Sequence, residues 1–470
     1  MLAAPTPAST PGSGPPRRRA ILLVLVLAFC FSPLDYSILE PVMPRIQAEF
    51  EIGRVTVSWV LIVFSMALML GAPLVAKLSD VLGRRRAFVL TLAALALGSL
   101  VSALAPSYAA LLLGRALQGL GAGGIAPIMA AIVGDVFPAG VRGRVLGLMG
   151  VVVGLGLLLG TVVGELSARL GWRPLFLISV PTLAILAMAG WGLIPDGQRR
   201  SLRHTDWPGL AVLIAIVASL LYGLTTRSHG WPYLALAALL LPIFWRVEQR
   251  QADPLVPPDL LRSRQMCIAA LIAVGAGVAR TILIALPELA ARAPGPGVTA
   301  KNLWLPLTVA IVGGSLISGA LVDRAGSRVV LVAGLALVGL ATLVSVRWRG
   351  SVAPVMLASV AYGLGFATLV GAPVRHMFLA GAPPADRGAA QGVFAMLWAL
   401  GQELSAVAVA DDRGLAGTGV GALPVALAML AGLMLLLAVC ALGLAGRAPE
   451  PTLQPAGSMD PNDAIARRRV

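Results

Sequence analysis

Long apolar runs alternate with short polar segments along almost the whole chain. Each run is close to the roughly 20 residues that a helix needs to cross a bilayer. The pattern predicts about fourteen transmembrane helices and an all-α membrane protein. Their expected positions are residues 20–42, 56–76, 87–105, 109–131, 143–166, 174–194, 208–226, 231–247, 266–289, 302–322, 329–346, 352–374, 388–410 and 421–445. An even number of helices places both termini on one side of the membrane.

Composition and charge extend this picture. Of the 470 residues, 58% are hydrophobic and only 12% are charged, which excludes an ordinary soluble protein of this length. About two thirds of the Lys and Arg residues, Arg375 among them, fall in loops expected on the side of the N-terminus. This bias predicts a multi-pass protein of the plasma (inner) membrane with both termini cytoplasmic. The net charge of +15 then reflects topology, and we expect no nucleic-acid binding.

The two halves of the chain repeat one another. The segment 76–85, around Asp80, recurs as 319–328, around Asp323, and Arg142 and Arg387 are separated by nearly the same interval. A shared interval at two landmarks indicates a duplication of six helices. We therefore predict two six-helix bundles, 20–194 and 265–446, with linkers and two added helices in 195–264. The ends, 1–19 and 447–470, are predicted to be disordered cytoplasmic tails.

The repeated loops predict a conformational latch. An Asp followed by Gly and Arg suits a tight turn whose carboxylate reaches the next helix, and such a contact can form in one conformation and break in another. The alternative is that these residues only make turns and set the topology. The residues assigned to the latch are Asp80, Gly83, Arg84, Arg142, Asp323, Arg324, Gly326, Arg328 and Arg387.

Charged residues inside the apolar runs are candidates for function, because an ionised group in the bilayer is costly. Asp35, Arg115, Arg280 and Glu403 all lie about 20 Å from the cytoplasmic ends of their helices, at a rise of about 1.5 Å per residue. We expect them to face one central cavity, together with Tyr36 and Gln118. Asp35 is the expected principal proton carrier, and Glu40 and Glu403 are further candidates. Each acid could instead be only a buried partner of a neighbouring helix, and Arg115 only an anchor.

Several motifs support a family resemblance over residues 20–446. They are Gly319-x-Leu321-x-Asp323-Arg324-x-Gly326-x-Arg328, Leu34-Asp35-x-Ser37 with Pro44, Arg115-x-x-Gln118-Gly119-x-Gly121, and the segment 171–181, which begins Gly-Trp-Arg-Pro. The chain resembles the major facilitator superfamily, in particular its 14-helix drug:proton antiporter branch. The resemblance implies two bundles that rock about a central site, with protons as the driving ion.

The fifth predicted helix departs from that branch. Antiporters of the branch typically carry Gly-x-x-x-Gly-Pro-x-x-Gly-Gly there, whereas this chain has Gly156, Gly160, Thr161, Gly164 and Glu165 at the corresponding positions. The glycines still permit close helix packing. The missing proline and the added carboxylate leave the direction of coupling open.

These observations predict a proton-coupled exporter of small amphipathic cations, a multidrug efflux protein that works by alternating access as a monomer. The alternative is a facilitator or proton symporter for an anionic metabolite, held by Arg115 and Arg280. A membrane-embedded enzyme is a minor alternative, because no nucleophile–base grouping or phosphate-binding loop is present. We expect no cofactor and no metal, and the three cysteines, Cys30, Cys267 and Cys440, lie apart in apolar runs.

Overall fold

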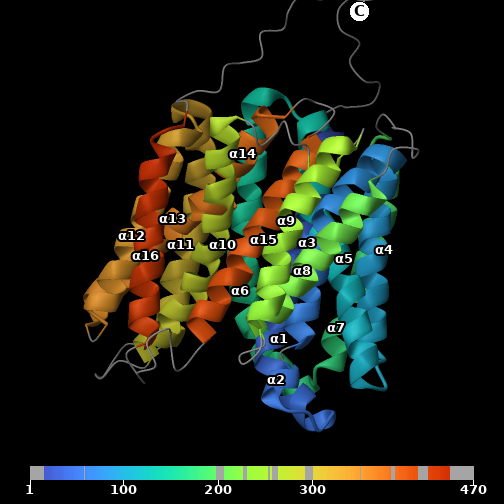
Figure 1. The fold of residues 1–470 in the computed structure, drawn as a ribbon, viewed down its shortest axis with the longest axis horizontal. Helices are drawn as coiled ribbons and strands as arrows, with labels where there is room; N and C mark the ends of the chain where they lie inside the picture. Colours follow the sequence, from blue (N-terminus) through green and yellow to red (C-terminus); the bar gives the residue numbers. More distant parts are fainter. Residues whose placement is uncertain are drawn as a thin grey trace, which may run out of the picture.

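The computed structural model of the chain describes residues 15–57, 59–196, 206–225, 230–251, 254–256, 263–291, 300–349, 351–382, 387–410 and 422–444. Within these ranges all regular structure is helical, which confirms the predicted all-α class (Figure 1). The helices are α1 (Pro15–Glu49), α2 (Arg54–Val57), α3 (Trp59–Leu82), α4 (Arg84–Ala103), α5 (Tyr108–Val136), α6 (Ala139–Leu170), α7 (Arg173–Leu193), α8 (Trp207–Thr225), α9 (Trp231–Arg250), α10 (Arg264–Ala291), α11 (Ala300–Ala325), α12 (Ser327–Arg347), α13 (Val352–Val370), α14 (Ala372–Ala380), α15 (Arg387–Ala410) and α16 (Ala422–Ala441).

Membrane-spanning character follows from length and hydropathy. In the described part of the chain, 10 helices are long and apolar enough to cross a bilayer. The number of about fourteen stays a prediction. Several helices extend beyond the expected ranges, among them α1, which ends at Glu49 instead of residue 42, and α3, which ends at Leu82 instead of residue 76. Two further differences bear on the site and the tail. α1 starts at Pro15, inside the segment predicted as a disordered tail, because proline suits the first turn of a helix, where no N–H partner is needed. The run expected at 352–374 is divided at Gly371 and continues as α14 to Ala380.

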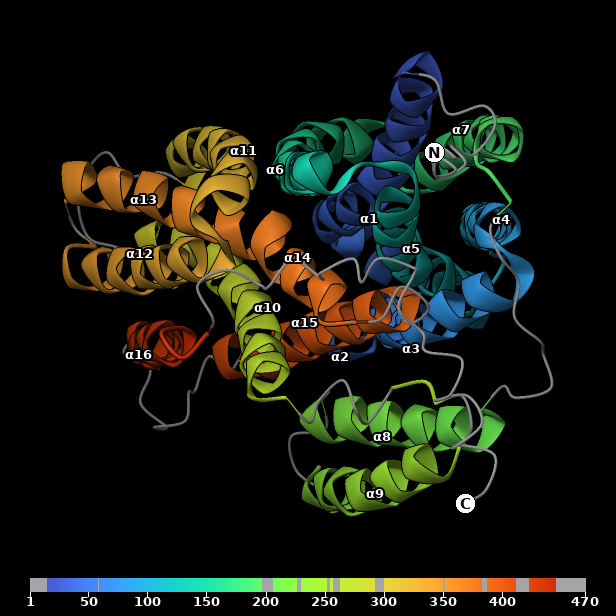
Figure 2. The same cartoon turned by 90° about the horizontal axis from the view of Figure 1, so that it is seen from above.

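The helices form two groups with a hairpin beside them. Helices α1 and α3–α7 lie on one side and α10–α16 on the other, while α8 and α9 lie side by side along the flank (Figure 2). The two groups meet where α3 packs against α15 and α6 against α11. The hairpin touches both groups, since α8 contacts α3 and α15. Contacts of α5 with α15 and of α13 and α14 with α6 complete this interface, which lies at the centre of the molecule (Figure 2).

Glycines bring α10 and α15 into very close contact. A Cβ added to Gly277 would overlap the carbonyl oxygen of Trp398, and one added to Gly401 would overlap that of Val274. Small residues at such crossings let two backbones approach closely in a membrane protein. Because Arg280 follows Gly277 by one turn and Glu403 follows Gly401, this crossing also brings a cation and an acid together.

Two sharp turns define one end of the molecule. α3 turns into α4 at Gly83, where φ is 90°, and α11 turns into α12 at Gly326, where φ is 81°. Only glycine adopts such angles without strain, which explains the repeated glycine of the loop motif. We call this end, the upper one in Figure 1, the motif end. It is the end that the charge bias predicts to be cytoplasmic.

The Gly-Trp-Arg-Pro segment fastens the opposite end of the first group. The Trp172 indole donates a hydrogen bond of 2.6 Å to Glu49 at the end of α1. Arg173 pairs with the same carboxylate at 2.5 Å and donates to the carbonyl oxygens of Ala103 and Ala105 after α4. One short segment therefore connects the ends of α1, α4 and α7.

Candidate functional site

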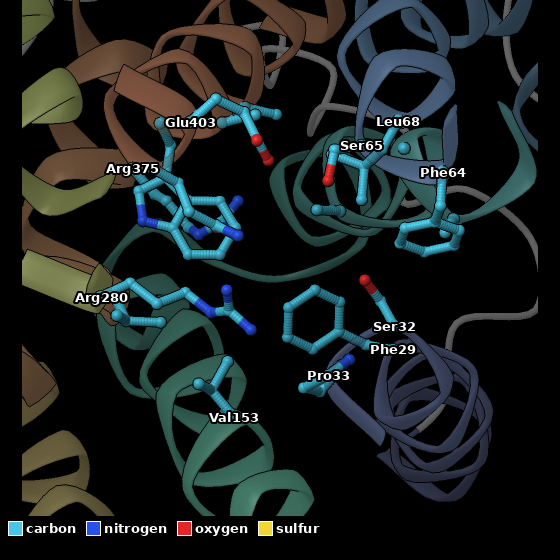
Figure 3. A pocket seen from close by; sticks show the side chains of 18 residues that line it. Phe29, Ser32, Pro33, Phe64, Ser65, Leu68, Val153, Arg280, Arg375 and Glu403 are labelled. Atoms are coloured by element: carbon cyan, nitrogen blue, oxygen red, sulfur yellow. The ribbon is translucent and has the colours of Figure 1, made fainter. Parts of the chain in front are cut away.

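A cavity of about 880 Å³, including the part open to solvent, lies between the two groups of helices (Figure 3). Its walls come from α1, α3, α5 and α6 on one side and from α10, α13, α14 and α15 on the other. Most of the lining is apolar. The polar and charged lining residues are Ser32, Ser65, Arg280, Arg375, Gln402 and Glu403. An apolar pocket with a few polar groups is the usual form of a site for a small organic molecule.

Glu403 is the carboxylate of the cavity. It accepts a hydrogen bond from Ser65 on the opposite side and interacts electrostatically with Arg280. Figure 3 shows the carboxylate of Glu403 and the guanidinium of Arg280 both directed into the space between the two groups. The acid thus contacts both groups of helices at once, and its protonation state bears on how they are held together.

Arg375 is a second cavity cation, and the sequence analysis missed it. The prediction that it lies in a cytoplasmic loop is wrong, because α14 resumes after the break at Gly371 and carries it into the protein, where it is 4% exposed. The apolar residues that follow it, Met377 to Leu379, are the signal that could have revealed a buried position. Its guanidinium lies 4.6 Å from the ring centroid of Phe394.

Asp35 belongs to a separate network within the first group. Its Oδ2 lies 2.6 Å from Nη1 of Arg115, and Nε2 of Gln118 donates to its Oδ1 at 3.5 Å. Arg115 is completely buried and also donates to the carbonyl oxygen of Val60 at 3.2 Å. The ring of Phe64 lies 4.1 Å from the Arg115 guanidinium and also lines the cavity. The predicted single layer of four charges is therefore divided into two acid–base pairs.

Only one of the two acid–base pairs lines the cavity. Arg280 and Glu403 line the cavity, as expected, whereas Asp35, Arg115 and Gln118 are not among its lining residues. The prediction assumed that residues at one depth also face one centre. In the structure, Phe64 packs between the cavity and the Arg115 side chain, so that the Asp35 pair lies behind the wall.

Several predicted site residues lie outside the described side chains. These are Tyr36, Glu40, Gly160, Gly164, Glu165, Asp323 and Arg387. Gly156, the first glycine of the fifth predicted helix, packs on α1, because an added Cβ would lie 2.9 Å from Pro33. Among the described residues there is no group of three or more His, Cys, Asp or Glu side chains that could hold a metal ion.

The first copy of the predicted latch forms two neighbouring sets of hydrogen bonds, one around Arg84 and one around Arg142. Arg84 pairs with Asp80 at 2.6 Å, across the turn, and with Asp135 at the end of α5 at 3.3 Å. Asp135 was not anticipated from the sequence. Arg142 donates to the carbonyl oxygens of Gly134 and Phe137, at 2.7 and 2.9 Å, and so holds the next turn. In the second copy, Arg324 is exposed and Gly326 and Arg328 are half-buried.

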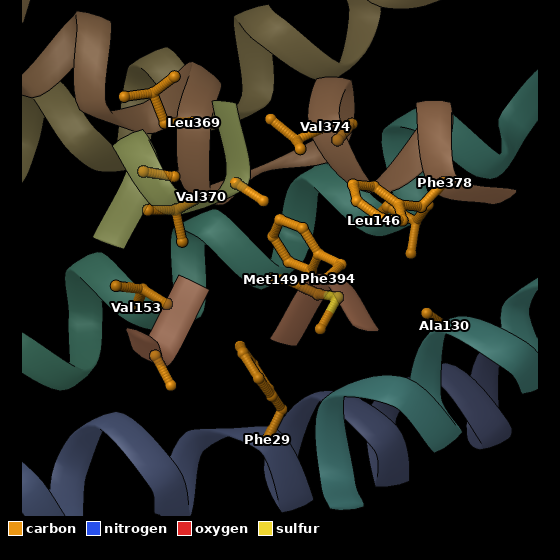
Figure 4. Close-up of a cluster of buried hydrophobic side chains, with 14 of the residues drawn as sticks. Phe29, Ala130, Leu146, Met149, Val153, Leu369, Val370, Val374, Phe378 and Phe394 are labelled. Carbon is orange, nitrogen blue, oxygen red and sulfur yellow. The ribbon is translucent and has the colours of Figure 1, made fainter. Parts of the chain in front are cut away.

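A cluster of apolar side chains lies where the two groups of helices meet beside the cavity (Figure 4). Val153 of α6 lines the cavity, and Met149 and Leu146, on the following turns towards the motif end, are fully buried. They lie with Phe29 from α1 and Phe394 from α15, so both groups contribute. We call these five residues the seal.

Close backbone contacts between the two groups occur on the same side of the cavity. A Cβ on Gly147 would lie 3.0 Å from the carbonyl oxygen of Ser315, and one on Gly392 would lie 3.0 Å from the Cα of Pro73. At these two positions the two groups of helices are packed in direct contact. The close contacts and the seal lie on the same side of the cavity.

Comparison with known proteins identifies the family. The sequence pattern described as the Major Facilitator Superfamily matches residues 25–406. The chain belongs to the major facilitator superfamily. Members of this superfamily are transporters, so the protein is a transporter and the prediction that it is not an enzyme is confirmed. The 14-helix branch stays a prediction.

Alignments with individual relatives extend over most of this major facilitator protein. It is 29% identical to the puromycin resistance protein pur8 of Streptomyces alboniger, over 80% of this chain and 78% of that protein. It is also 29% identical to the multidrug resistance protein Stp of Mycobacterium tuberculosis, over 79% of this chain and 71% of the relative. A crystal structure of the human organic anion transporter MFSD10 has a TM-score of 0.67 at 21% identity, covering 91% and 100% of the two chains, which shows the shared fold.

Proposed function

We propose that this protein is a proton-coupled secondary transporter that exports small amphipathic organic compounds by alternating access. The observation that carries the proposal is the cavity between two groups of helices, with the Glu403 carboxylate in its wall. An ionisable acid inside the membrane region is by default a functional group. The names of the relatives, puromycin resistance and multidrug resistance, support export as the direction.

Glu403 is the proton acceptor that substrate can reach. When it is ionised, it attracts Arg280 and accepts the hydrogen bond of Ser65. Protonation removes the charge, so the attraction to Arg280 is lost. A polar group of the substrate that binds the ionised form competes with the proton, and this competition couples the two movements. Asp35 is the second proton carrier, since its side chain is 15% exposed and protonation would break its ion pair with Arg115.

Alternating access requires the seal to open. Charge bias assigns the motif end to the cytoplasm, so we take the described conformation as closed on the cytoplasmic side. The opposite state separates the seal and lifts the start of α15, at Gly392, from Pro73 on α3. The latch around Asp80 and Arg84 follows directly on α3 and stabilises one of the two states. The two groups of helices act as the moving bodies, in a monomer of the inner membrane.

The test uses purified protein in liposomes with an imposed pH gradient and a fluorescent amphipathic dye. We expect Glu403→Gln to abolish gradient-driven dye movement while dye binding persists, because the amide keeps the shape but cannot release a proton. Asp35→Asn should also abolish proton-driven movement. Glu51→Gln, in an exposed loop, is the matched control and should transport normally. Normal gradient-driven transport by Glu403→Gln would remove the proposed role of the cavity acid.

A second candidate function is a facilitator or proton symporter for an anionic metabolite. Arg280 and Arg375 favour it, since two cations and one acid line the cavity. The same liposomes separate the two functions. An exporter driven by exchange moves its cargo against the direction of proton flow, whereas a symporter moves both in the same direction.

A further inference from the structure

Arg375 carries a charge that the described protein does not balance. Its side chain is 4% exposed, and neither Nε nor Nη1 has a hydrogen-bond partner. In the described part of the chain, Arg375 forms no ion pair. Its guanidinium makes a cation–π contact with the ring of Phe394. A guanidinium stays protonated even when buried. Burying such a charge without an anion is costly, so the arrangement is electrostatically complete only when an anionic group approaches.

The neighbouring groups of the cavity do not supply that anion. Glu403 is the one carboxylate among the cavity-lining residues of the described chain, and it is already engaged by Ser65 and Arg280. Trp398, another lining residue, has an indole N–H without a partner. The cavity therefore offers hydrogen-bond donors in excess of acceptors, and this excess suits a ligand that brings acceptor oxygens.

The guanidinium is not needed to hold α14 in place. The backbone carbonyl oxygen of Arg375 accepts a hydrogen bond of 2.9 Å from Nε2 of Gln391 on α15. That bond fixes α14 against α15 whatever side chain residue 375 carries. The charged end of the side chain is thus free for another role, and it lies in the wall of the mostly apolar cavity between the two groups of helices.

We propose that compounds bound in this cavity carry an acidic group, and that Arg375 binds it. The carboxylate, sulfonate or phosphate of the compound pairs with the guanidinium, and its apolar body lies against Phe29 and Phe64. Glu403 is left for a proton or for a basic group of the same compound. The inference rests on the proposed function in one respect, that this cavity is the substrate site, and it selects acid-bearing cargo over simple cations.

Equilibrium binding of three probes with one ring system tests the proposal. The probes are naphthylacetate, the neutral naphthylacetamide and the cationic naphthylethylamine, titrated into purified protein in nanodiscs near pH 7 without any gradient. A charge-assisted pair in a buried site should make naphthylacetate bind about tenfold or more tightly than the amide. Arg375→Gln should erase that preference, and Arg375→Lys should keep part of it. Arg349→Gln, an exposed arginine, is the control and should leave it unchanged.

Two results would overturn the proposal: equal binding of the three probes by the wild-type protein, or a tenfold preference for naphthylacetate that survives in Arg375→Gln. If Arg375→Gln does not fold, Arg375→Lys decides. A preference for naphthylacetate that is as large in the lysine variant as in the wild-type protein would then overturn the proposal. The proposed function fails separately. If the protein prefers naphthylacetate but moves no cargo in a pH gradient, the acid-binding site is retained and proton coupling is refuted. If the protein exports cargo in a pH gradient but shows no preference for naphthylacetate, proton coupling is retained and the acid-binding site is refuted.

Discussion

Two ion pairs of almost equal length should differ several-fold in their contribution to stability. Arg115 and Asp35 lie 2.6 Å apart with side chains 0% and 15% exposed, and Arg173 and Glu49 lie 2.5 Å apart with side chains 37% and 40% exposed. Distance alone predicts equal strength. Burial predicts otherwise, because water screens an exposed pair while a buried pair interacts at low effective dielectric.

The magnitudes follow from that difference. Removing one partner of a buried pair leaves an uncompensated charge and costs about 3–5 kcal/mol. An exposed pair contributes about 0–1 kcal/mol. Arg115→Gln should therefore destabilise the protein by about 3–5 kcal/mol. Arg173→Gln should cost about 1–2 kcal/mol, since it also loses its hydrogen bonds to the carbonyl oxygens of Ala103 and Ala105.

Double-mutant cycles isolate the pairs from the other contacts of each arginine. The first cycle combines Asp35→Asn with Arg115→Gln, and the second, matched cycle combines Glu49→Gln with Arg173→Gln. The free energy of unfolding is measured by titration with sodium dodecyl sulfate and followed by tryptophan fluorescence. We expect a coupling energy of about 2–3 kcal/mol in the first cycle and less than about 1 kcal/mol in the second. Equal coupling in the two cycles would refute the argument from burial.

The remaining predictions concern contacts between helices. With the native cysteines replaced, Ala76→Cys with Gly392→Cys should form a disulfide, since the two Cβ atoms would lie 3.1 Å apart and a small shift brings them to the roughly 3.5 Å or more that the bond requires. The oxidised protein should not transport until it is reduced. Unimpaired transport by the fully oxidised protein, quantified by thiol labelling, would show that α3 and α15 need not separate there. Gly277→Ala should prevent folding or lower thermal stability strongly, since the new methyl group overlaps the Trp398 carbonyl, whereas Gly432→Ala meets nothing within 4 Å and should be silent. Equal melting temperatures of these two glycine variants, measured in detergent, would contradict the described crossing.

The position of charges along the membrane could be predicted because it is a property of one helix at a time. Depth follows from counting residues at about 1.5 Å each, and so the sequence identified Arg280 and Glu403 as residues of one layer. The direction in which a side chain points depends on how its helix is rotated against its neighbours. That rotation is set by packing, and it gave Asp35 the buried partner Arg115 within the same group of helices.

Arg375 shows that hydropathy along the chain does not predict where a helix ends. Hydropathy placed the end of its helix just before it, because an arginine lowers the local average. The break at Gly371 and the bond from Gln391 to the Arg375 carbonyl are tertiary features, and they carry this cation into the cavity wall.

The sequence by itself determined that the chain is helical and membrane-spanning, the approximate positions of its helices and the places of the two sharp glycine turns, because hydrophobicity and backbone freedom act over short distances. The tertiary structure alone decided which charges pair, which of them reach the cavity and where the two groups of helices are in direct contact. Those properties depend on the close approach of residues far apart in the chain, such as Gly277 with Trp398 and Gly392 with Pro73, which no local pattern encodes.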